Sequence, residues 1–66
     1  MKREEIVEKL VENFNGKIVA DTSFLTIVDI GSCKITINKN GEMILRDINS
    51  SDAEILSGKL MKFFDV

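Results

Sequence analysis

The apolar residues of this 66-residue chain change their spacing twice, from helical to alternating and back to helical, and this pattern limits the possible folds most strongly. From Lys2 to Phe14 they recur every three or four residues, which predicts an amphipathic helix. Its apolar positions are Ile6, Val7, Leu10, Val11 and Phe14. Its charged side carries Glu4, Glu5, Glu8, Lys9 and Glu12. Asn15 and Gly16 then supply a left-handed stop.

The middle of the chain is rich in β-branched residues at alternating positions, which predicts strands. Four strands are expected, at Lys17–Ala20, Phe24–Ile30, Cys33–Asn38 and Glu42–Ile48. The segments between them are short, so consecutive strands should pair as neighbours. The predicted sheet is therefore a mainly antiparallel meander of four strands.

Two turns fix the register of the last three strands. The pair Gly31-Ser32 fits a two-residue type II′ hairpin, which places Val28 opposite Ile35. Gly41 fits the left-handed bulge position of a three-residue loop, which sets Ile35 opposite Leu45. A tighter second turn would bring a charged side chain onto the apolar face, so the longer loop is preferred.

This register gives the sheet one apolar face and one mixed face. The apolar face consists of the cross-strand rows Thr26/Ile37/Met43, Val28/Ile35/Leu45 and Ile30/Cys33/Asp47. We expect it to form the core, with Cys33 as an inert buried thiol. The mixed face carries the rows Leu25/Asn38/Glu42, Ile27/Thr36/Ile44 and Asp29/Lys34/Arg46. We expect this second face to lie open.

The last part of the chain returns to helical spacing. A capping box at 51–54, with Ser51 and Glu54 as its ends, predicts that a helix starts at Ser51. The apolar face of this helix holds Ala53, Leu56, Leu60, Phe63 and Phe64. Gly58 lowers the helix propensity, so we interpret it as a point of close contact with the first helix or the sheet. Residues 1–66 thus predict a single two-layer α+β domain, with both helices on one sheet face.

The composition excludes most common catalytic and metal sites. The chain has no His and a single Cys, so a Ser/His/Asp triad, an imidazole metal site, an intrachain disulfide and a thiolate zinc site cannot form within it. A formal net charge of −2 and the lack of Trp and Tyr argue against nucleic acid binding. No apolar stretch reaches the length of a membrane span. We therefore expect a cytoplasmic, non-enzymatic protein that binds neither membrane nor nucleic acid.

The first functional hypothesis is a small non-catalytic interaction module. An apolar stripe on the open face predicts contact with a protein partner or a second copy of the chain, although β-propensity alone could fill these positions. The predicted interaction residues are Leu25, Ile27 and Ile44 in the stripe, with Lys34 and Arg46 beside it. With Asp29, these cations are expected to form a solvated cross-strand ion network, or else a site for an anion.

The alternative hypothesis is weak divalent-cation binding, with calcium as the ion. Segment 47–54 is rich in the carboxylate, amide and hydroxyl oxygens that calcium prefers. The predicted ligands are Asp47, Asn49, Asp52 and Glu54. Their spacing departs from that of an EF-hand loop, and helix capping explains part of the composition without an ion. No other cofactor is expected.

Overall fold

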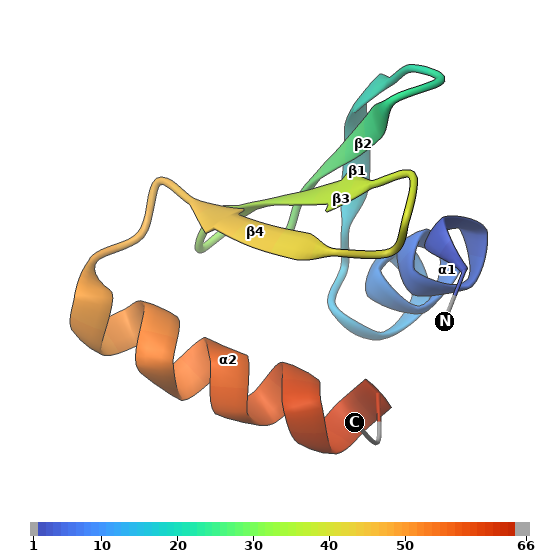
Figure 1. The fold of residues 1–66 in the computed structure, drawn as a ribbon. Helices are drawn as coiled ribbons and strands as arrows, with labels where there is room; N and C mark the ends of the chain where they lie inside the picture. The colour runs from blue at the N-terminus through green and yellow to red at the C-terminus, as the bar shows by residue number, and fades with distance from the viewer. Residues whose placement is uncertain (1, 65–66) are drawn as a thin grey trace.

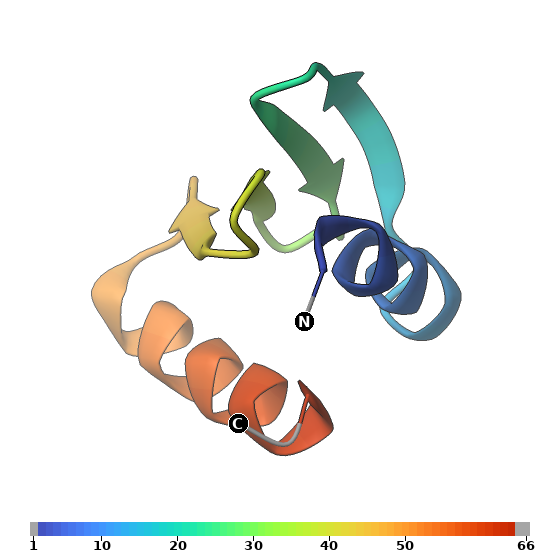
Figure 2. The ribbon, with the colours of Figure 1, turned by 45° about the vertical axis from the view of Figure 1, so that its right-hand side comes forward.

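A computed structural model describes residues 2–64 and has the element order helix, four strands, helix (Figure 1). Helix α1 spans Arg3–Asn13 and helix α2 spans Ser50–Phe64. The strands are β1 (Lys17–Asp21), β2 (Leu25–Asp29), β3 (Lys34–Asn38) and β4 (Met43–Arg46). They form one antiparallel sheet in the order β1-β2-β3-β4, with both helices on the same side of it (Figures 1 and 2). The predicted α+β fold is confirmed.

The two turns set the register as the sequence predicts. Gly31 has a φ of 92°, and Val28 lies opposite Ile35. Gly41 has a φ of 89°, and Ile35 lies opposite Leu45. Both glycines adopt a positive φ that residues with a side chain rarely adopt. Each glycine therefore fixes the type and length of its turn, and the turn fixes which residues of the two strands pair.

Strand β1 joins the sheet through a bulge that the sequence analysis did not predict. Ile18 pairs with Val28 and Ala20 pairs with Ile27, so Val19 is an extra residue in β1. Because of this extra residue, Ile18 stays on the helix-facing side while Ala20 turns to the opposite face. Ile18 and Val19 are about half exposed, at 52% and 53%.

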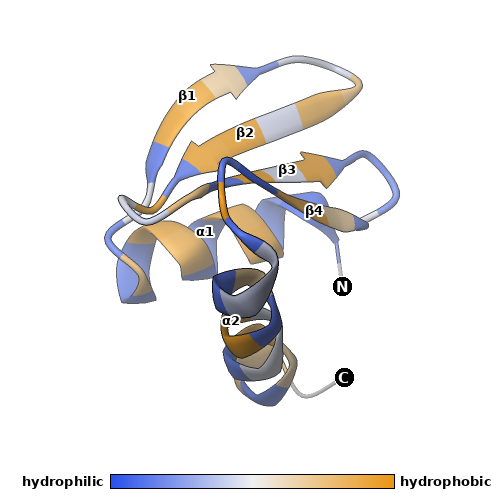
Figure 3. Ribbon diagram, turned by 90° about the vertical axis from the view of Figure 1, so that its left-hand side faces the viewer, coloured by the Kyte–Doolittle hydropathy of each residue, from blue (hydrophilic) through white to orange (hydrophobic). Residues whose placement is uncertain are grey.

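The core lies between the sheet and the two helices. Its buried apolar side chains are Ile6, Leu10, Val28, Cys33, Ile35, Ile37, Leu60 and Phe64. Figure 3 shows hydrophobic segments on both helices and on the strands above them. Helix α1 packs against β2 and β3. Near their C-terminal ends the helices meet through Phe14 and Phe63, whose rings stand edge to face with centroids 5.3 Å apart.

Helix α2 begins at Ser50 because its N-cap is Asn49. The Asn49 side-chain oxygen accepts a hydrogen bond from the Asp52 amide at 2.8 Å, and the Asn49 side-chain nitrogen donates to the Asp52 carboxylate at 2.9 Å. The predicted capping box of Ser51 and Glu54 is therefore wrong. Asn and Ser are both good N-caps, and Asn49 can also donate a side-chain hydrogen bond to the carboxylate three residues later.

The glycine that permits close packing is Gly16, and the interpretation of Gly58 is wrong. A Cβ built on Gly58 would meet nothing within 4 Å. A Cβ on the buried Gly16 would lie 2.6 Å from Val28 Cγ1 and 3.0 Å from the Leu10 carbonyl oxygen. The left-handed residue after α1 is Asn15, with a φ of 55°. Gly16 is therefore needed for space, while Asn15 provides the turn of the backbone.

Replacement of Gly58 by Ala is expected to stabilise the protein by about 0.5–1 kcal/mol, because alanine loses less backbone entropy in a helix interior. Gly31→Ala is the matched control, since that site also has open space within 4 Å but a φ of 92°. The control should destabilise the protein. Urea unfolding followed by circular dichroism measures both changes, and a destabilising Gly58→Ala would contradict the open surroundings of this site.

Candidate functional site

The sheet face opposite the helices has no covering element among residues 2–64 (Figures 1 and 3). Its central row crosses all four strands and consists of Ala20, Ile27, Thr36 and Ile44. The row beside it contains Lys17, Asp29, Lys34 and Arg46. On the other side, Leu25 pairs with Asn38. The predicted pairings on this face are confirmed, and β1 adds a residue to two of the rows.

Thr36 stands in the middle of the central row and is buried, with 3% of its surface exposed. Its hydroxyl oxygen has no hydrogen-bond partner among the described residues. Such a buried, unpaired hydroxyl costs about 1–3 kcal/mol of stability. Around it, Ile44 is 38% exposed, whereas Leu25 and Ile27 are half-buried. The structure thus brings the three predicted stripe residues together around an unpaired polar atom.

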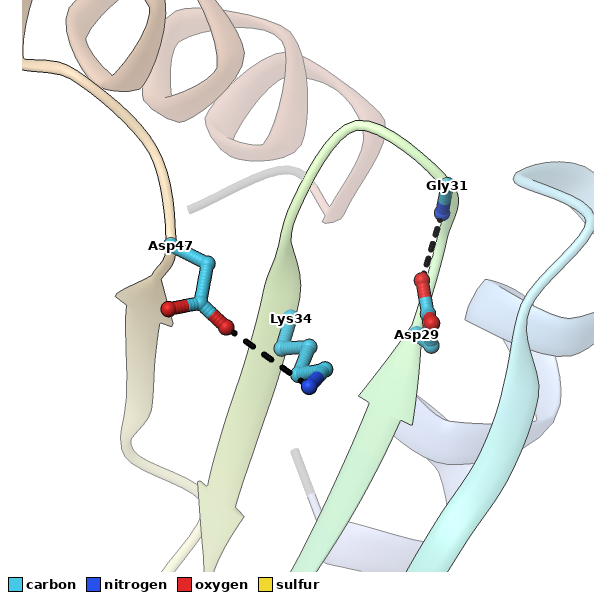
Figure 4. A network of polar contacts seen from close by, with 4 residues as sticks. All are labelled: Asp29, Gly31, Lys34 and Asp47. Atoms are coloured by element: carbon cyan, nitrogen blue, oxygen red, sulfur yellow. Dashed lines mark hydrogen bonds and ion pairs between the residues drawn. The ribbon is translucent and has the colours of Figure 1, made fainter.

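The charged row is arranged differently from the predicted network (Figure 4). Lys34 Nζ lies 3.7 Å from Asp47 Oδ2, and Asp29 accepts a hydrogen bond from the Gly31 amide at 2.8 Å. The ion network predicted for Asp29, Lys34 and Arg46 is therefore wrong. The Asp29 carboxylate accepts from the Gly31 amide, and Lys34 pairs with Asp47 instead. The pair of Lys34 and Asp47 is exposed and contributes at most about 1 kcal/mol.

Asp47 lies outside the core layer in which the sequence analysis placed it. Strand β4 ends at Arg46, and Asp47 has a φ of 58°, which interrupts the alternation of side chains. Its carboxylate reaches Lys34, a residue of the open face. An ionised carboxylate beside Ile30 and Cys33 would lose its hydration without gaining a partner, so the strand ends before that row.

In the acidic turn, segment 47–54, three of the four predicted calcium ligands already have partners within the chain. Asp47 pairs with Lys34, Asn49 and Asp52 bond to each other, and Glu54 is exposed on α2. Within residues 2–64, no three His, Cys, Asp or Glu side chains are grouped so that they could hold a metal ion. Capping and ion pairing would compete with an ion for these oxygens. Calcium binding by this turn stays a prediction.

Cys33 is buried in the core, as predicted, with 4% of its surface exposed. Burial raises the pKa of its thiol, a hydrogen bond with Ser32 lowers that pKa, and the charges of Asp29 and Asp47 raise it further. The net change is upward, so the folded protein favours the protonated thiol. A protonated, buried thiol is a poor nucleophile, which agrees with a structural role.

The raised pKa of Cys33 predicts that the free energy of unfolding falls as the pH rises above about 8.5, the ordinary thiol value. In that range the unfolded chain releases the thiol proton while the folded chain retains it, so deprotonation favours unfolding. Below the ordinary thiol pKa, both the folded and the unfolded chain hold the proton, and the free energy of unfolding is not reduced by the thiol. Urea unfolding at a series of alkaline pH values should show a shallower decline for Cys33→Ala, and equal slopes for the two proteins would contradict the prediction.

A second surface feature, which the sequence analysis missed, is a groove of about 470 Å³ between one flank of α1 and strand β1. Its apolar lining is Val7, Val11 and Ile18, and its acidic lining is Glu4, Glu8, Glu12 and Asp21. Arg3 and Thr26 complete it. The helical spacing assigned the glutamates to the solvent side of α1. It could not show that β1 projects beyond that flank, because this depends on how the helix sits on the sheet.

Comparisons of this chain with protein-family models, with curated proteins and with solved structures find no match. In the described part of the chain, neither helix is long and apolar enough to cross a membrane. The described residues present two surfaces that could bind a partner, the open sheet face and the groove beside α1.

Proposed function

We propose that this chain is a small non-catalytic interaction module that associates through its open sheet face, and that its partner there is a second copy of the chain. The observation that carries the proposal is the buried, unpaired hydroxyl of Thr36 at the centre of an apolar row. Valine has nearly the same shape and would avoid the cost of that unpaired group. A threonine in this place makes sense when its hydroxyl gains a partner in a complex.

A second copy suits this face because the arrangement of its rows is self-complementary. A twofold axis through the central row would bring Thr36 close to Thr36 of the second copy. The hydroxyl is covered in the single chain, so the side chains around it must shift on association before one hydroxyl can donate to the other. The end of the open face that bears Lys34 and Arg46 in one copy would then approach the end that bears Glu42 in the other copy. The two apolar rows would cover each other, which removes Ile27 and Ile44 from water.

The size of the face sets the expected strength of the association. Four strands spaced about 4.8 Å apart, each with four or five residues rising about 3.3 Å, make a face of roughly 15 Å by 16 Å. Two such faces bury less than the roughly 1,200 Å² of a standard interface. We therefore expect a transient dimer that forms at high micromolar to millimolar concentrations.

Sedimentation equilibrium over a concentration series up to about 1 mM tests this proposal, because weak interfaces of this size dissociate at lower concentrations. The weight-average mass of the wild type should rise with concentration, and Ile44→Lys and Ile27→Lys should abolish the rise while retaining the fold. Ile55→Lys, on an exposed position of α2, is the matched control and should behave as the wild type. A mass that stays monomeric for the wild type would contradict self-association.

Thr36→Val separates the stability of the free chain from its association. The variant should raise the free energy of unfolding by about 1 kcal/mol, because it removes an unpaired buried hydroxyl. It should also weaken the dimer, because the hydroxyl pair across the axis is lost. A variant that is less stable than the wild type, or that associates as strongly, would show that the hydroxyl has no part in the interface.

A further inference from the structure

The helix layer leaves part of the sheet uncovered beneath β1. Helix α1 packs against β2 and β3, and α2 reaches the core through Leu60 and Phe64. Ile18 faces the same side of the sheet as the fully buried Val28, its neighbour across the strand pair, yet Ile18 is 52% exposed. The groove of about 470 Å³ occupies this place between β1 and the flank of α1. One more element of a helix layer could lie there.

The rim of this groove is acidic, apart from one residue at its end. Glu4, Glu8 and Glu12 follow one flank of α1 at intervals of four residues, so they lie one turn apart and repel each other. On the opposite side, the carboxylate of Asp21 is held by the Thr26 hydroxyl, which donates to it at 2.8 Å. Arg3 donates to the Thr22 carbonyl oxygen at 3.1 Å, which ties the start of α1 to the β1–β2 turn. A cationic ligand would relieve the repulsion along the rim.

We propose that this groove binds a cationic amphipathic helix of a partner protein. The apolar face of that helix would cover Val7, Val11 and Ile18, and its Lys or Arg side chains would pair with the glutamates. Glutamates four residues apart in a helix are spaced about 6 Å along its axis, which matches cations placed at every fourth residue of a helix lying alongside. The same acidic rim repels phosphate groups, so it disfavours nucleic acids and anionic lipids.

A helix fits this place better than an added strand. Strand β1 is an edge strand, and the extra residue Val19 interrupts the regular pairing positions that a further strand would need. The groove residue Ile18 lies on the face of the sheet that carries Val28, and this is the side on which the ribbons of α1 and α2 lie (Figure 2). A third helix would continue that layer. This site is separate from the open sheet face, so either proposal can fail without the other.

The test uses a synthetic helical peptide of roughly 18 residues, long enough to form a helix, with leucine and alanine on one face and lysine at every fourth position. Titration into the ¹⁵N-labelled protein should shift the amide signals of α1 and β1, with a dissociation constant of about 1–100 µM. The signals of the open face, such as those of Ile44 and Thr36, should stay in place. A peptide with glutamate in place of lysine should not bind, and added salt should weaken the binding of the cationic peptide.

Matched variants test the two parts of the site. Glu8→Gln with Glu12→Gln should weaken binding about three- to tenfold, whereas Glu5→Gln with Glu54→Gln, which changes the net charge equally, should change it less than about twofold. Ile18→Thr should weaken binding, whereas Val19→Thr, at an equally exposed position outside the groove, should not.

Three results would overturn the proposal. The first is the absence of shifts in α1 and β1 up to about 1 mM peptide, since a dissociation constant above that value corresponds to less than about 4 kcal/mol. The second is equal weakening by the two pairs of glutamate variants, because binding would then follow net charge rather than the groove. The third is a shift of the groove signals with protein concentration alone, which would assign the groove to a second copy of the chain.

Discussion

Leu10→Ala is expected to leave much of the protein unfolded at room temperature. Leu10 is fully buried between α1 and the sheet, and replacement of a buried leucine by alanine costs about 2–5 kcal/mol through lost burial and the cavity left behind. A domain below about 70 residues rarely has more than 3–5 kcal/mol of stability in total. The loss is therefore comparable to the whole free energy of unfolding.

Helix propensity cannot account for this loss, because alanine is at least as good a helix former as leucine. Val11→Ala, at the next position of the same helix, is the matched control, since Val11 is 39% exposed and lines the groove. We expect that change to cost less than about 1 kcal/mol. Circular dichroism with urea unfolding measures both variants. A Leu10→Ala protein as stable as the control would place Leu10 outside the core.

Gly16→Ala is expected to destabilise the protein by about 1–3 kcal/mol, the usual cost of overpacking a close contact. The new Cβ would lie 2.6 Å from Val28 Cγ1, and the valine cannot turn away easily, because it is fully buried and β-branched. The Leu10 carbonyl, 3.0 Å away, is held by hydrogen bonds from the amides of Phe14 and Gly16. Neither the Val28 side chain nor the Leu10 carbonyl group can move away from the new Cβ without losing packing contacts or hydrogen bonds.

A double-mutant cycle identifies the cause of that loss. Val28→Ala removes the methyl group that the new Cβ meets, so the double variant with Gly16→Ala should be more stable than the sum of the single changes by at least about 1 kcal/mol. Gly16→Ala shares its chemistry with Gly58→Ala, for which the opposite sign is expected. Additive single changes would show that the contact with Val28 is not the source of the destabilisation.

The register of the sheet was predictable from the sequence because local chemistry fixes it. Gly31 and Gly41 must take left-handed conformations in turns of defined length, and one pairing of the strands follows from each. A slip by one residue would carry Ile35 from the core face to the other face, and burial of that residue opposes the slip. The same logic gave the stripe of Leu25, Ile27 and Ile44 on the open face.

The errors of the sequence analysis share one physical origin. The cap at Asn49, the departure of Asp47 from the strand and the close contact at Gly16 each depend on atoms that are distant in the chain or on a choice between equally good local partners. The groove beside α1 depends on where a helix rests across a sheet. Residue types and their spacing do not determine the position of a helix across the strands of a sheet.

The sequence by itself determined the elements, their order, the two hairpin registers and the apolar face of the sheet, because these follow from periodicity and from backbone preferences at single residues. The tertiary structure decided which flank of α1 stays uncovered, where Glu8 and Ile18 come together, and that the Thr36 hydroxyl is buried without a partner. Such features arise when separate elements pack together. Their energies are set by close contacts in space, which no local pattern records.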